Sequence, residues 1–228
     1  SVFSMDGDTA PLREIVEITQ KYDAILMIDD AHATGVFGQH GKGMIEHYGL
    51  EGKVDIIMGS LSKAIGSIGG FIAGNKCLID FLKNKARSFI YTTALPPAAC
   101  AASLAGLTLI QEDTSLIDKL WENVRYLKTQ LSEFISNISA ESPIIPIIIG
   151  SAEDALNLST RLYENGILIP AIRPPTVPLG TSRLRISLMA THSKEDINRL
   201  IDTLKAIGFF VTVHLTAENA KIAEVVKE

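Results

Sequence analysis

Two short apolar runs, each followed at once by polar residues, constrain the fold of this chain most. Residues 24–28 precede the sequence Asp-Asp-Ala-His at 29–32, and the mostly apolar run 54–58 precedes Gly-Ser-Leu-Ser-Lys at 59–63. Such runs are typical of strands buried in a parallel sheet. Because open α/β sheets bind ligands at the carboxyl ends of their strands, the two polar segments are predicted to lie together at one functional edge.

The residue types in these segments match the needs of pyridoxal 5'-phosphate. An aldehyde cofactor needs an amine to hold it covalently, and its pyridinium ring needs an anion beside the ring nitrogen. Lys63 and Asp29, 34 positions apart, supply these two groups. Ser60 and Ser62 precede the lysine and are candidates for binding the phosphate, and His32 is a candidate for hydrogen bonding to the phenolic oxygen.

Each of these residues also has an ordinary structural interpretation. A lysine after a strand is most often a solvated charge, and an aspartate pair is typical of a turn or a helix cap. A metal-dependent hydrolase that uses Asp29 and His32 is a further alternative. However, adjacent strand residues point to opposite faces, so Asp30 would not join that site, and no metal site is predicted.

Composition narrows the class of protein. The 228 residues include 21 Lys and Arg against 26 Asp and Glu, a net charge of −5, and no basic cluster, which argues against a nucleic-acid partner. The 46% of hydrophobic residues fall in runs shorter than the roughly 20 residues of a membrane span, so no membrane partner is expected. Cys77 and Cys100 lie in apolar surroundings and are predicted to be buried thiols of a cytoplasmic protein.

Hydrophobic periodicity predicts an α/β fold in which helices alternate with the strands of a mainly parallel sheet. Pro11 suits the first turn of a helix that continues to Tyr22. After the strands that end at Asp29 and before Lys63, the predicted elements are a strand at 69–73, a helix at 77–86, an extended piece at 89–93 and a helix at 97–111.

A long amphipathic helix is predicted next, as a link between domains. Its apolar stripe consists of Leu116, Leu120, Val124, Leu127, Leu131 and Ile135. The following elements are a strand at 144–149, a helix at 152–164, strands at 167–172 and 183–189, and a helix at 193–207 opened by a Ser-x-x-Asp cap at Ser193. The predicted domains are the C-terminal half of a cofactor-binding major domain (1–112), a small C-terminal domain (113–215) and a polar tail (216–228).

Four stretches of the chain resemble the α-oxoamine synthase family of fold-type I pyridoxal phosphate enzymes. They are Phe-Ser-Met-Asp-Gly-Asp-Thr-Ala-Pro-Leu at 3–12, Asp-Asp-Ala-His-Ala-Thr-Gly at 29–35, Ser-Leu-Ser-Lys at 60–63, and AIRPPTVPLGTSRLRISLMATH at 171–192. The last is the most discriminating, and the resemblance extends to about residue 208. It implies the remainder of a PLP-transferase major domain followed by a smaller α+β C-terminal domain.

The resemblance also implies roles for individual residues around the cofactor. Lys63 would hold the cofactor, and Asp29 would pair with its ring nitrogen. His32 and Ser4 would contact the region of the phenolic oxygen. Ser60 would bind the phosphate at a position where the family often has threonine, and this change keeps the hydroxyl.

Further roles concern the partner subunit and the substrate. Thr92 and Thr93 lie in a segment that reaches the phosphate of the neighbouring subunit in relatives. Arg185 matches the arginine that holds the amino-acid carboxylate, and Thr176 matches a substrate-contacting position in the proline-rich loop that Arg173 opens. Without the resemblance, Arg185 would be interpreted as part of a solvated strand face, and Arg173 as part of a rigid loop.

The activity that the resemblance implies is the decarboxylative condensation of L-alanine with a pimeloyl thioester, carried by acyl carrier protein or coenzyme A, in biotin biosynthesis. It implies a homodimeric, cytoplasmic acyltransferase. A glycine C-acetyltransferase, another α-oxoamine synthase, and a noncatalytic binding or dimerisation module remain alternatives. Relatives carry a glycine-containing phosphate loop and a ring-stacking histidine upstream of the matched region. Neither is among these residues, so the chain is interpreted as an incomplete fragment.

Overall fold

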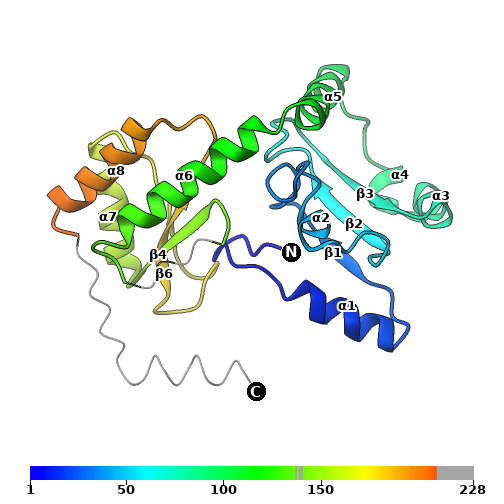
Figure 1. Cartoon of the computed structure of the whole chain (residues 1–228), viewed down its shortest axis with the longest axis horizontal. Helices are drawn as coiled ribbons and strands as arrows, with labels where there is room; N and C mark the ends of the chain where they lie inside the picture. Colours follow the sequence, from blue (N-terminus) through cyan, green and yellow to red (C-terminus); the bar gives the residue numbers. More distant parts are fainter. Residues whose placement is uncertain (137, 139–140, 210–228) are drawn as a thin grey trace. The chain divides into compact units, whose positions relative to one another are not determined.

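A computed structural model describes residues 1–136, 138 and 141–209 of the chain (Figure 1). The chain divides into two compact units, which are described separately. The first unit comprises residues 1–122 and 141–144, and the second comprises residues 123–140 and 145–228. The predicted polar tail at 216–228 lies outside the described residues.

The first unit alternates helices with the strands of a three-stranded sheet in the order β1-β2-β3. Its elements are α1 (Leu12–Lys21), β1 (Met27–Asp29), α2 (Met44–Tyr48), β2 (Ile56–Ser60), β3 (Gly70–Gly74), α3 (Lys76–Lys85), α4 (Arg87–Ile90), α5 (Pro97–Glu112) and the start of α6 (Ser115–Leu131). Pro11 is the N-cap of α1, directly before its first turn, as predicted. The predicted α/β fold class is confirmed.

The sheet of the first unit is mixed. β1 pairs in parallel with β2, and Asp29 is in register with Met58. β2 pairs with β3 in the antiparallel direction, and Ser60 is in register with Gly70. The connection between β2 and β3 is too short for the crossover that a parallel pair needs, so the chain turns back on itself.

The core of the first unit collects the apolar faces of α1, β1 and α2. Leu12, Val16, Ile28 and Met44 are buried in it. Trp121 packs against this core, and its indole Nε1–H donates to the carbonyl oxygen of Val36 at 2.9 Å. The spacing that predicted α1 is therefore the spacing of its buried face.

The prediction of buried thiols is wrong for both cysteines, because Cys77 and Cys100 are exposed. Cys77 lies on α3, which buries no residue, and Cys100 lies on α5, where Ser103 alone is buried. Their apolar neighbours are exposed as well, with Phe81 60% and Leu104 68% accessible. An apolar local sequence buries a thiol only where another element covers it, and no described element covers these helix faces.

The predicted extended piece at 89–93 is also wrong. Arg87–Ile90 form the short helix α4, and the amide of Tyr91 donates to the carbonyl of Arg87 at 3.0 Å to close its turn. The aromatic and β-branched residues favour a strand, but β-propensity depends on a neighbouring strand to pack against.

Among the described residues, no helix is both long and apolar enough to span a bilayer.

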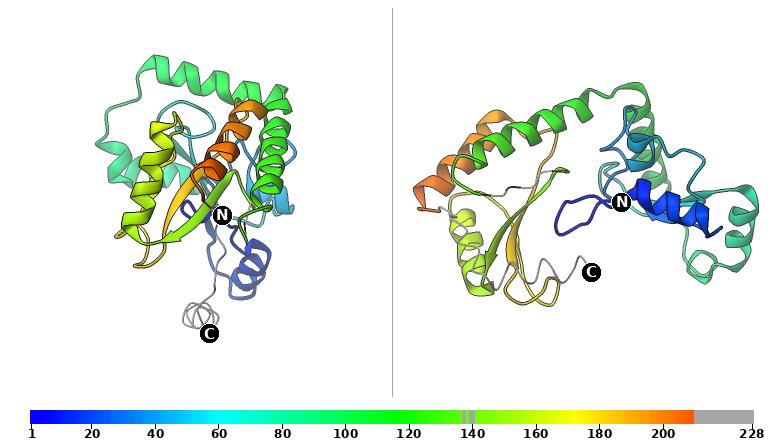
Figure 2. Two further views of the ribbon diagram at one scale, coloured as in Figure 1. Left: turned by 90° about the vertical axis from the view of Figure 1, so that its left-hand side faces the viewer. Right: turned by 60° about the horizontal axis from the view of Figure 1, so that its bottom comes forward.

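The second unit packs helices on one side of a three-stranded sheet in the order β4-β6-β5 (Figure 2). Its elements are the remainder of α6, β4 (Ile144–Gly150), α7 (Ala152–Glu164), β5 (Ala171–Ile172), β6 (Ser182–Ser187) and α8 (Lys194–Ala206). β5 and β6 are antiparallel, with Ile172 in register with Arg183.

The start of α8 has the predicted cap. The amide of Asp196 donates to Ser193 Oγ at 3.1 Å, and the amide of Ser193 donates to Asp196 Oδ2 at 2.9 Å, which completes a capping box. The predicted stripe is buried except for Leu116, which is 47% accessible, and Ile117 is buried in its place. Along α6 the buried apolar residues are spaced alternately by three and four positions, as a helix face requires: Ile117, Leu120, Val124, Leu127 and Leu131. Ile135 is buried as well but lies beyond the end of the helix.

The core of the second unit gives a test of the fold. Leu184 is fully buried in β6, whereas Leu179 in the preceding loop is 88% exposed. We expect Leu184→Ala to lower the free energy of unfolding by about 2–5 kcal/mol, because it leaves a cavity. Leu179→Ala is the matched control, with an expected change within about 0.5 kcal/mol. Equal effects in chemical denaturation would contradict this packing.

Candidate active site

The parallel pairing of β1 with β2 brings the two predicted segments to one edge of the first unit's sheet. Asp29 ends β1 in register with Met58, and Ser60 ends β2 two residues later. Lys63 follows in the β2–β3 connection and is exposed. The carboxyl ends of both strands therefore face the same side, with Asp29, Ser60 and the Lys63 loop along it.

The loop that carries Lys63 is held at several points. The amide of Leu61 donates to the carbonyl of Gly69 at 2.9 Å, and the amide of Gly66 donates to the carbonyl of Lys63 at 3.0 Å. Ser67 Oγ donates to a carbonyl of α5 at 2.9 Å, and Ile65 is buried. The lysine thus extends from a loop with fixed ends that is anchored on α5.

Hydroxyl groups stand immediately before the lysine. Ser60 Oγ and Ser62 Oγ are 2.9 Å apart, and the amide of Ser62 donates to Ser60 Oγ at 3.1 Å. The backbone is closely packed here, because a Cβ on Gly70 would lie 2.8 Å from the carbonyl oxygen of Gly59. This turn places two serine hydroxyls side by side, and hydroxyl groups are among the donors that bind phosphate.

The carboxylate of Asp29 is oriented by the turn that follows it. Its Oδ1 accepts from the amide of Ala31 at 2.9 Å, and His32 lies half-buried one residue later. The amino group of Ser1 donates to the carbonyl oxygen of Asp29 at 2.8 Å, and Ser4 lies in the hairpin closed by the bridge between Val2 and Thr9. The opening hairpin therefore runs beside the end of β1.

The donor set at this edge fits pyridoxal phosphate. An exposed amine, an exposed carboxylate and paired hydroxyls meet the three needs of the cofactor, namely covalent attachment, a ring counter-ion and phosphate binding. The described residues contain no group of three or more His, Cys, Asp or Glu side chains placed to hold a metal ion. A cavity of about 590 Å³ lies instead in the second unit, beside Asp154 and Arg161.

Asp30 is the residue of this segment whose importance the sequence did not show. It is fully buried, while its neighbour Asp29 is exposed, as strand alternation predicts. Burial raises the pKa of Asp30, although the hydrogen bond from the amide of Met44 acts in the opposite direction. The signal in the sequence was the pair of adjacent acids, of which only one could face a ligand.

Arg173, Thr176 and Arg185 belong to the second unit, around the hairpin of β5 and β6. Arg185 lies on β6, and its guanidinium donates to Ser187 Oγ at 2.7 Å. Burial lowers the pKa of Arg185. Arg173 and Thr176 are exposed in the connecting loop, where the amide of Thr176 donates to the carbonyl of Arg173 at 3.1 Å. The hairpin gathers these three residues in one unit.

The remaining site predictions concern Thr92, Thr93 and the strand face of β6. Both threonines are exposed between α4 and α5. Arg183 on β6 is only 5% accessible, and its Nε–H donates to the carbonyl of Thr181 at 3.0 Å. Leu184, which points to the opposite face of β6, is fully buried as well, so neither face of the strand is open to solvent at this point.

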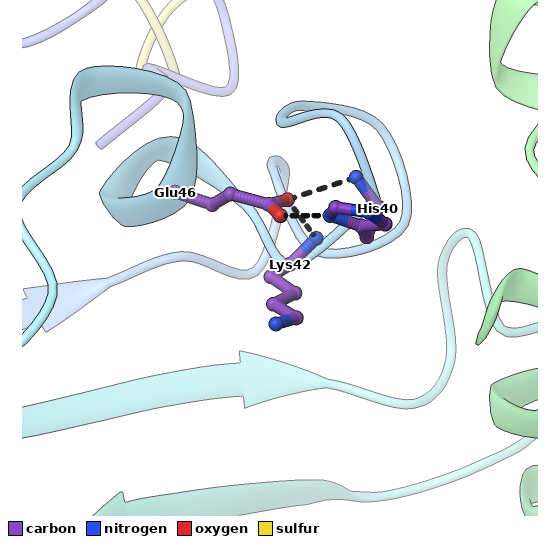
Figure 3. Close-up of polar contacts among 3 residues, drawn as sticks. All are labelled: His40, Lys42 and Glu46. Atoms are coloured by element: carbon purple, nitrogen blue, oxygen red, sulfur yellow. Dashed lines mark hydrogen bonds and ion pairs between the residues drawn. The ribbon is translucent and has the colours of Figure 1, made fainter.

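The turn that carries His32 continues into a glycine-rich loop that Glu46 closes (Figure 3). Glu46 Oε2 accepts from the amides of His40 at 3.0 Å and Lys42 at 3.1 Å, and Oε1 lies 2.6 Å from His40 Nδ1. A Cβ on Gly38, which has a φ of 86°, would lie 2.1 Å from Glu46 Oε2. Glycine at 38 therefore permits both the backbone conformation and the close approach.

This contact predicts a pH dependence of stability. Partial burial raises the pKa of Glu46, but the hydrogen bonds from His40 and Lys42 outweigh it and hold the pKa below its ordinary value of 4.5. A lowered native pKa stabilises the fold above pH 4.5, and this contribution disappears as the pH falls through the native pKa. Glu46→Gln should therefore lower the melting temperature at pH 7, with a difference from the unmodified chain that shrinks towards pH 3.

Glu51→Gln is the matched control, because Glu51 is an exposed glutamate that follows α2 closely in the chain. It should leave the melting temperature within about 1 °C across this range, as expected for an ordinary surface substitution. A pH-independent difference for Glu46→Gln would show that the carboxylate does not hold the loop by its charge.

The fold and this edge define an α/β domain with a lysine and an aspartate at the carboxyl ends of adjacent parallel strands. The chain belongs to the aminotransferase class I and II family, which matches residues 1–204. It is 50% identical over 208 residues to a putative 8-amino-7-oxononanoate synthase of Acetivibrio thermocellus, covering 91% of this chain and 54% of that protein. It is 44% identical to an 8-amino-7-oxononanoate synthase of Alkaliphilus oremlandii, with 91% and 53% covered. The chain thus spans about half the length of these relatives.

Solved structures share the fold. A Sphingomonas wittichii serine palmitoyltransferase is 33% identical with a TM-score of 0.87, over 92% of this chain and 54% of that one. A structure described as SPT with a PLP internal aldimine is 32% identical with a TM-score of 0.86, over 91% and 53%. An 8-amino-7-oxononanoate synthase from Francisella tularensis is 26% identical with a TM-score of 0.75, over 91% and 61%.

Proposed function

We propose that the protein to which this chain belongs is a pyridoxal phosphate-dependent acyltransferase that condenses L-alanine with a pimeloyl thioester and releases carbon dioxide. The product is 8-amino-7-oxononanoate, an intermediate of biotin biosynthesis, and the acyl carrier is acyl carrier protein or coenzyme A. The protein acts as a cytoplasmic homodimer in this proposal.

The parallel edge of the first unit is the observation that carries the proposal. Asp29, Ser60 and the Lys63 loop lie along it with the side chains that the cofactor requires. Sequence identity then favours 8-amino-7-oxononanoate synthase over serine palmitoyltransferase within the family. The chain is 44–50% identical to the two relatives named for the first activity and 33% identical to the serine palmitoyltransferase structure.

The residues of the first unit bind and orient the cofactor. When bound, pyridoxal phosphate supplies an aldehyde for covalent attachment and a ring that withdraws electrons from the substrate α-carbon. Lys63 would hold the cofactor covalently through its aldehyde, and Asp29 would hold a proton at the ring nitrogen. His32 and Ser4 bind near the phenolic oxygen, and the Ser60 hydroxyl binds the phosphate. Thr92 and Thr93 serve the phosphate of the second subunit.

The residues of the second unit bind the amino acid. Arg185 grips the carboxylate of L-alanine through its planar guanidinium, and Thr176 and Arg173 contact the substrate from the loop. The Lys63 amine would take the α-proton of the substrate and, after the carboxylate has left as carbon dioxide, would return a proton to the same carbon. Between these two proton transfers the α-carbon would attack the carbonyl carbon of the thioester, and the thiolate would leave.

The attachment of the cofactor is tested by chemical reduction. We expect borohydride treatment of the complete protein, extended upstream of Ser1 as far as its gene allows, to fix pyridoxal phosphate on Lys63. Mass spectrometry of the digested protein identifies the modified lysine. Lys53, an exposed lysine of the first unit, is the internal control and should stay unlabelled. Labelling of Lys53 alone, or of no lysine, would contradict the proposed site.

The substrates are tested by supplying L-alanine with pimeloyl thioester, and L-serine with palmitoyl-coenzyme A, to the same protein. The proposal predicts 8-amino-7-oxononanoate from the first pair and no long-chain amino ketone from the second. Turnover of the second pair alone would assign the protein to another branch of the family.

The carboxylate grip is tested by Arg185→Lys in the same assay. An ammonium group cannot reproduce the two-pronged contact of a guanidinium, so the KM for L-alanine should rise roughly tenfold or more. Cofactor attachment should persist, because Lys63 is unchanged. Arg173→Lys is the matched control with a smaller expected effect. If Arg173→Lys raised the KM for L-alanine more than Arg185→Lys does, carboxylate binding would be assigned to Arg173 instead of Arg185.

A further inference from the structure

Asp30 stands at a junction of three elements of the first unit. Its amide donates to the carbonyl of Met58 at 2.7 Å and so extends the pairing of β1 with β2 by one residue. Its carboxylate Oδ2 accepts from the amide of Met44, the first residue of α2, at 3.1 Å. A single fully buried side chain therefore joins the end of β1 to the start of α2.

The backbone of Asp30 also builds the turn that carries His32. Its carbonyl oxygen accepts from the amides of Ala33 at 3.0 Å and Thr34 at 2.9 Å, and from the Thr34 hydroxyl at 3.0 Å. Three donors thus converge on one carbonyl, and His32 lies inside the turn that they close. Any movement of Asp30 shifts this turn.

The loop from the turn to α2 is shaped around the same carboxylate. Gly43 has a φ of 103°, and a Cβ on it would lie 1.7 Å from Asp30 Oδ2. The backbone therefore reaches the carboxylate only because residue 43 has no side chain. Glycine is required at this position for two independent reasons, the left-handed backbone and the close approach.

We propose that Asp30 is a positioning residue, whose buried carboxylate locks the start of α2 against the end of β1 and thereby fixes Asp29 and His32 for the cofactor. The inference rests on the proposed function. It assigns Asp30 no contact with cofactor or substrate. The two adjacent acids at the end of β1 therefore have different proposed roles. Asp29 faces the cofactor, and Asp30 faces the protein interior.

A matched aspartate distinguishes positioning from general stability. Asp55 Oδ2 accepts from the amide of Leu26 at 2.8 Å, a comparable contact between a carboxylate and a backbone amide in the same sheet. Asp55 lies immediately before β2, at the amino end of that strand and away from the Asp29 edge. Asp55→Ala removes a hydrogen bond of the same kind, from an exposed rather than a buried carboxylate, without touching the turn.

The experiment titrates pyridoxal phosphate into the complete protein and records its visible absorption band against pH. For Asp30→Ala we expect roughly tenfold or weaker cofactor binding, because a hydrogen bond to a buried charged group is lost, together with a shifted pH midpoint of the band. Asp30→Asn keeps an acceptor oxygen for Met44 and should restore both readouts to within about twofold. Asp55→Ala should lower the melting temperature and leave both cofactor readouts unchanged.

Asp30→Ser replaces the alanine variant if that variant does not fold, because its hydroxyl is polar but one atom too short to reach Met44. Hydrogen exchange of residues 31–34 is measured on every variant, and faster exchange is expected in Asp30→Ala or Asp30→Ser only. Cofactor readouts that match those of Asp55→Ala would overturn the positioning role and leave the proposed function standing. Failure of the unmodified protein to attach the cofactor would overturn both.

Discussion

The parallel pairing of β1 with β2 is the interaction on which the arrangement of the candidate site depends. Asp29 and the Lys63 loop are separated by 34 positions in the chain, and only the alignment of these strands brings them to one edge. An antiparallel pairing would place the two strand ends at opposite edges. The carboxylate and the amine would then lie a strand length apart, too far to serve one small cofactor.

Alternation along β1 gives its two terminal acids different environments. Asp29 is exposed and its carboxylate is oriented by the amide of Ala31, whereas Asp30 is buried and holds the start of α2. A buried carboxylate is costly without hydrogen-bond donors, and the amide of Met44 supplies one to Oδ2 of Asp30. The turn after β1 leaves the carboxylate of Asp29 exposed and places the carboxylate of Asp30 against the amide of Met44.

Features set by local sequence were predicted well. The amphipathic spacing of α1, the capping box at Ser193 and the end of the first strand at Asp29 depend on neighbouring residues, and the structure has them where the patterns indicate. Features that depend on residues distant in the sequence were predicted poorly. The exposure of Cys77 and the burial of Arg183 depend on which elements cover a surface, and hydrophobic periodicity contains no such information.

The same distinction applies to the site. The chemistry of an amine and a carboxylate at adjacent strand ends was predicted from residue types, because that chemistry restricts which side chains can serve. Asp30 was missed as a supporting residue, since the pair of adjacent acids shows only that one of them faces away from the ligand and does not reveal the contacts of Asp30 with Met58 and Met44.

In the proposed function, cofactor chemistry and substrate choice depend on different parts of the chain. The first unit holds the groups proposed for the cofactor, and structures named serine palmitoyltransferase match this fold with TM-scores of 0.86 to 0.87. The fold and the cofactor edge therefore cannot by themselves select the acyl chain or the amino acid. In the proposed function that selection involves the β5–β6 hairpin, where Arg173, Thr176 and Arg185 lie in one unit. Substitutions in the hairpin should change which substrate is used, whereas substitutions at the cofactor edge should change whether any substrate is used.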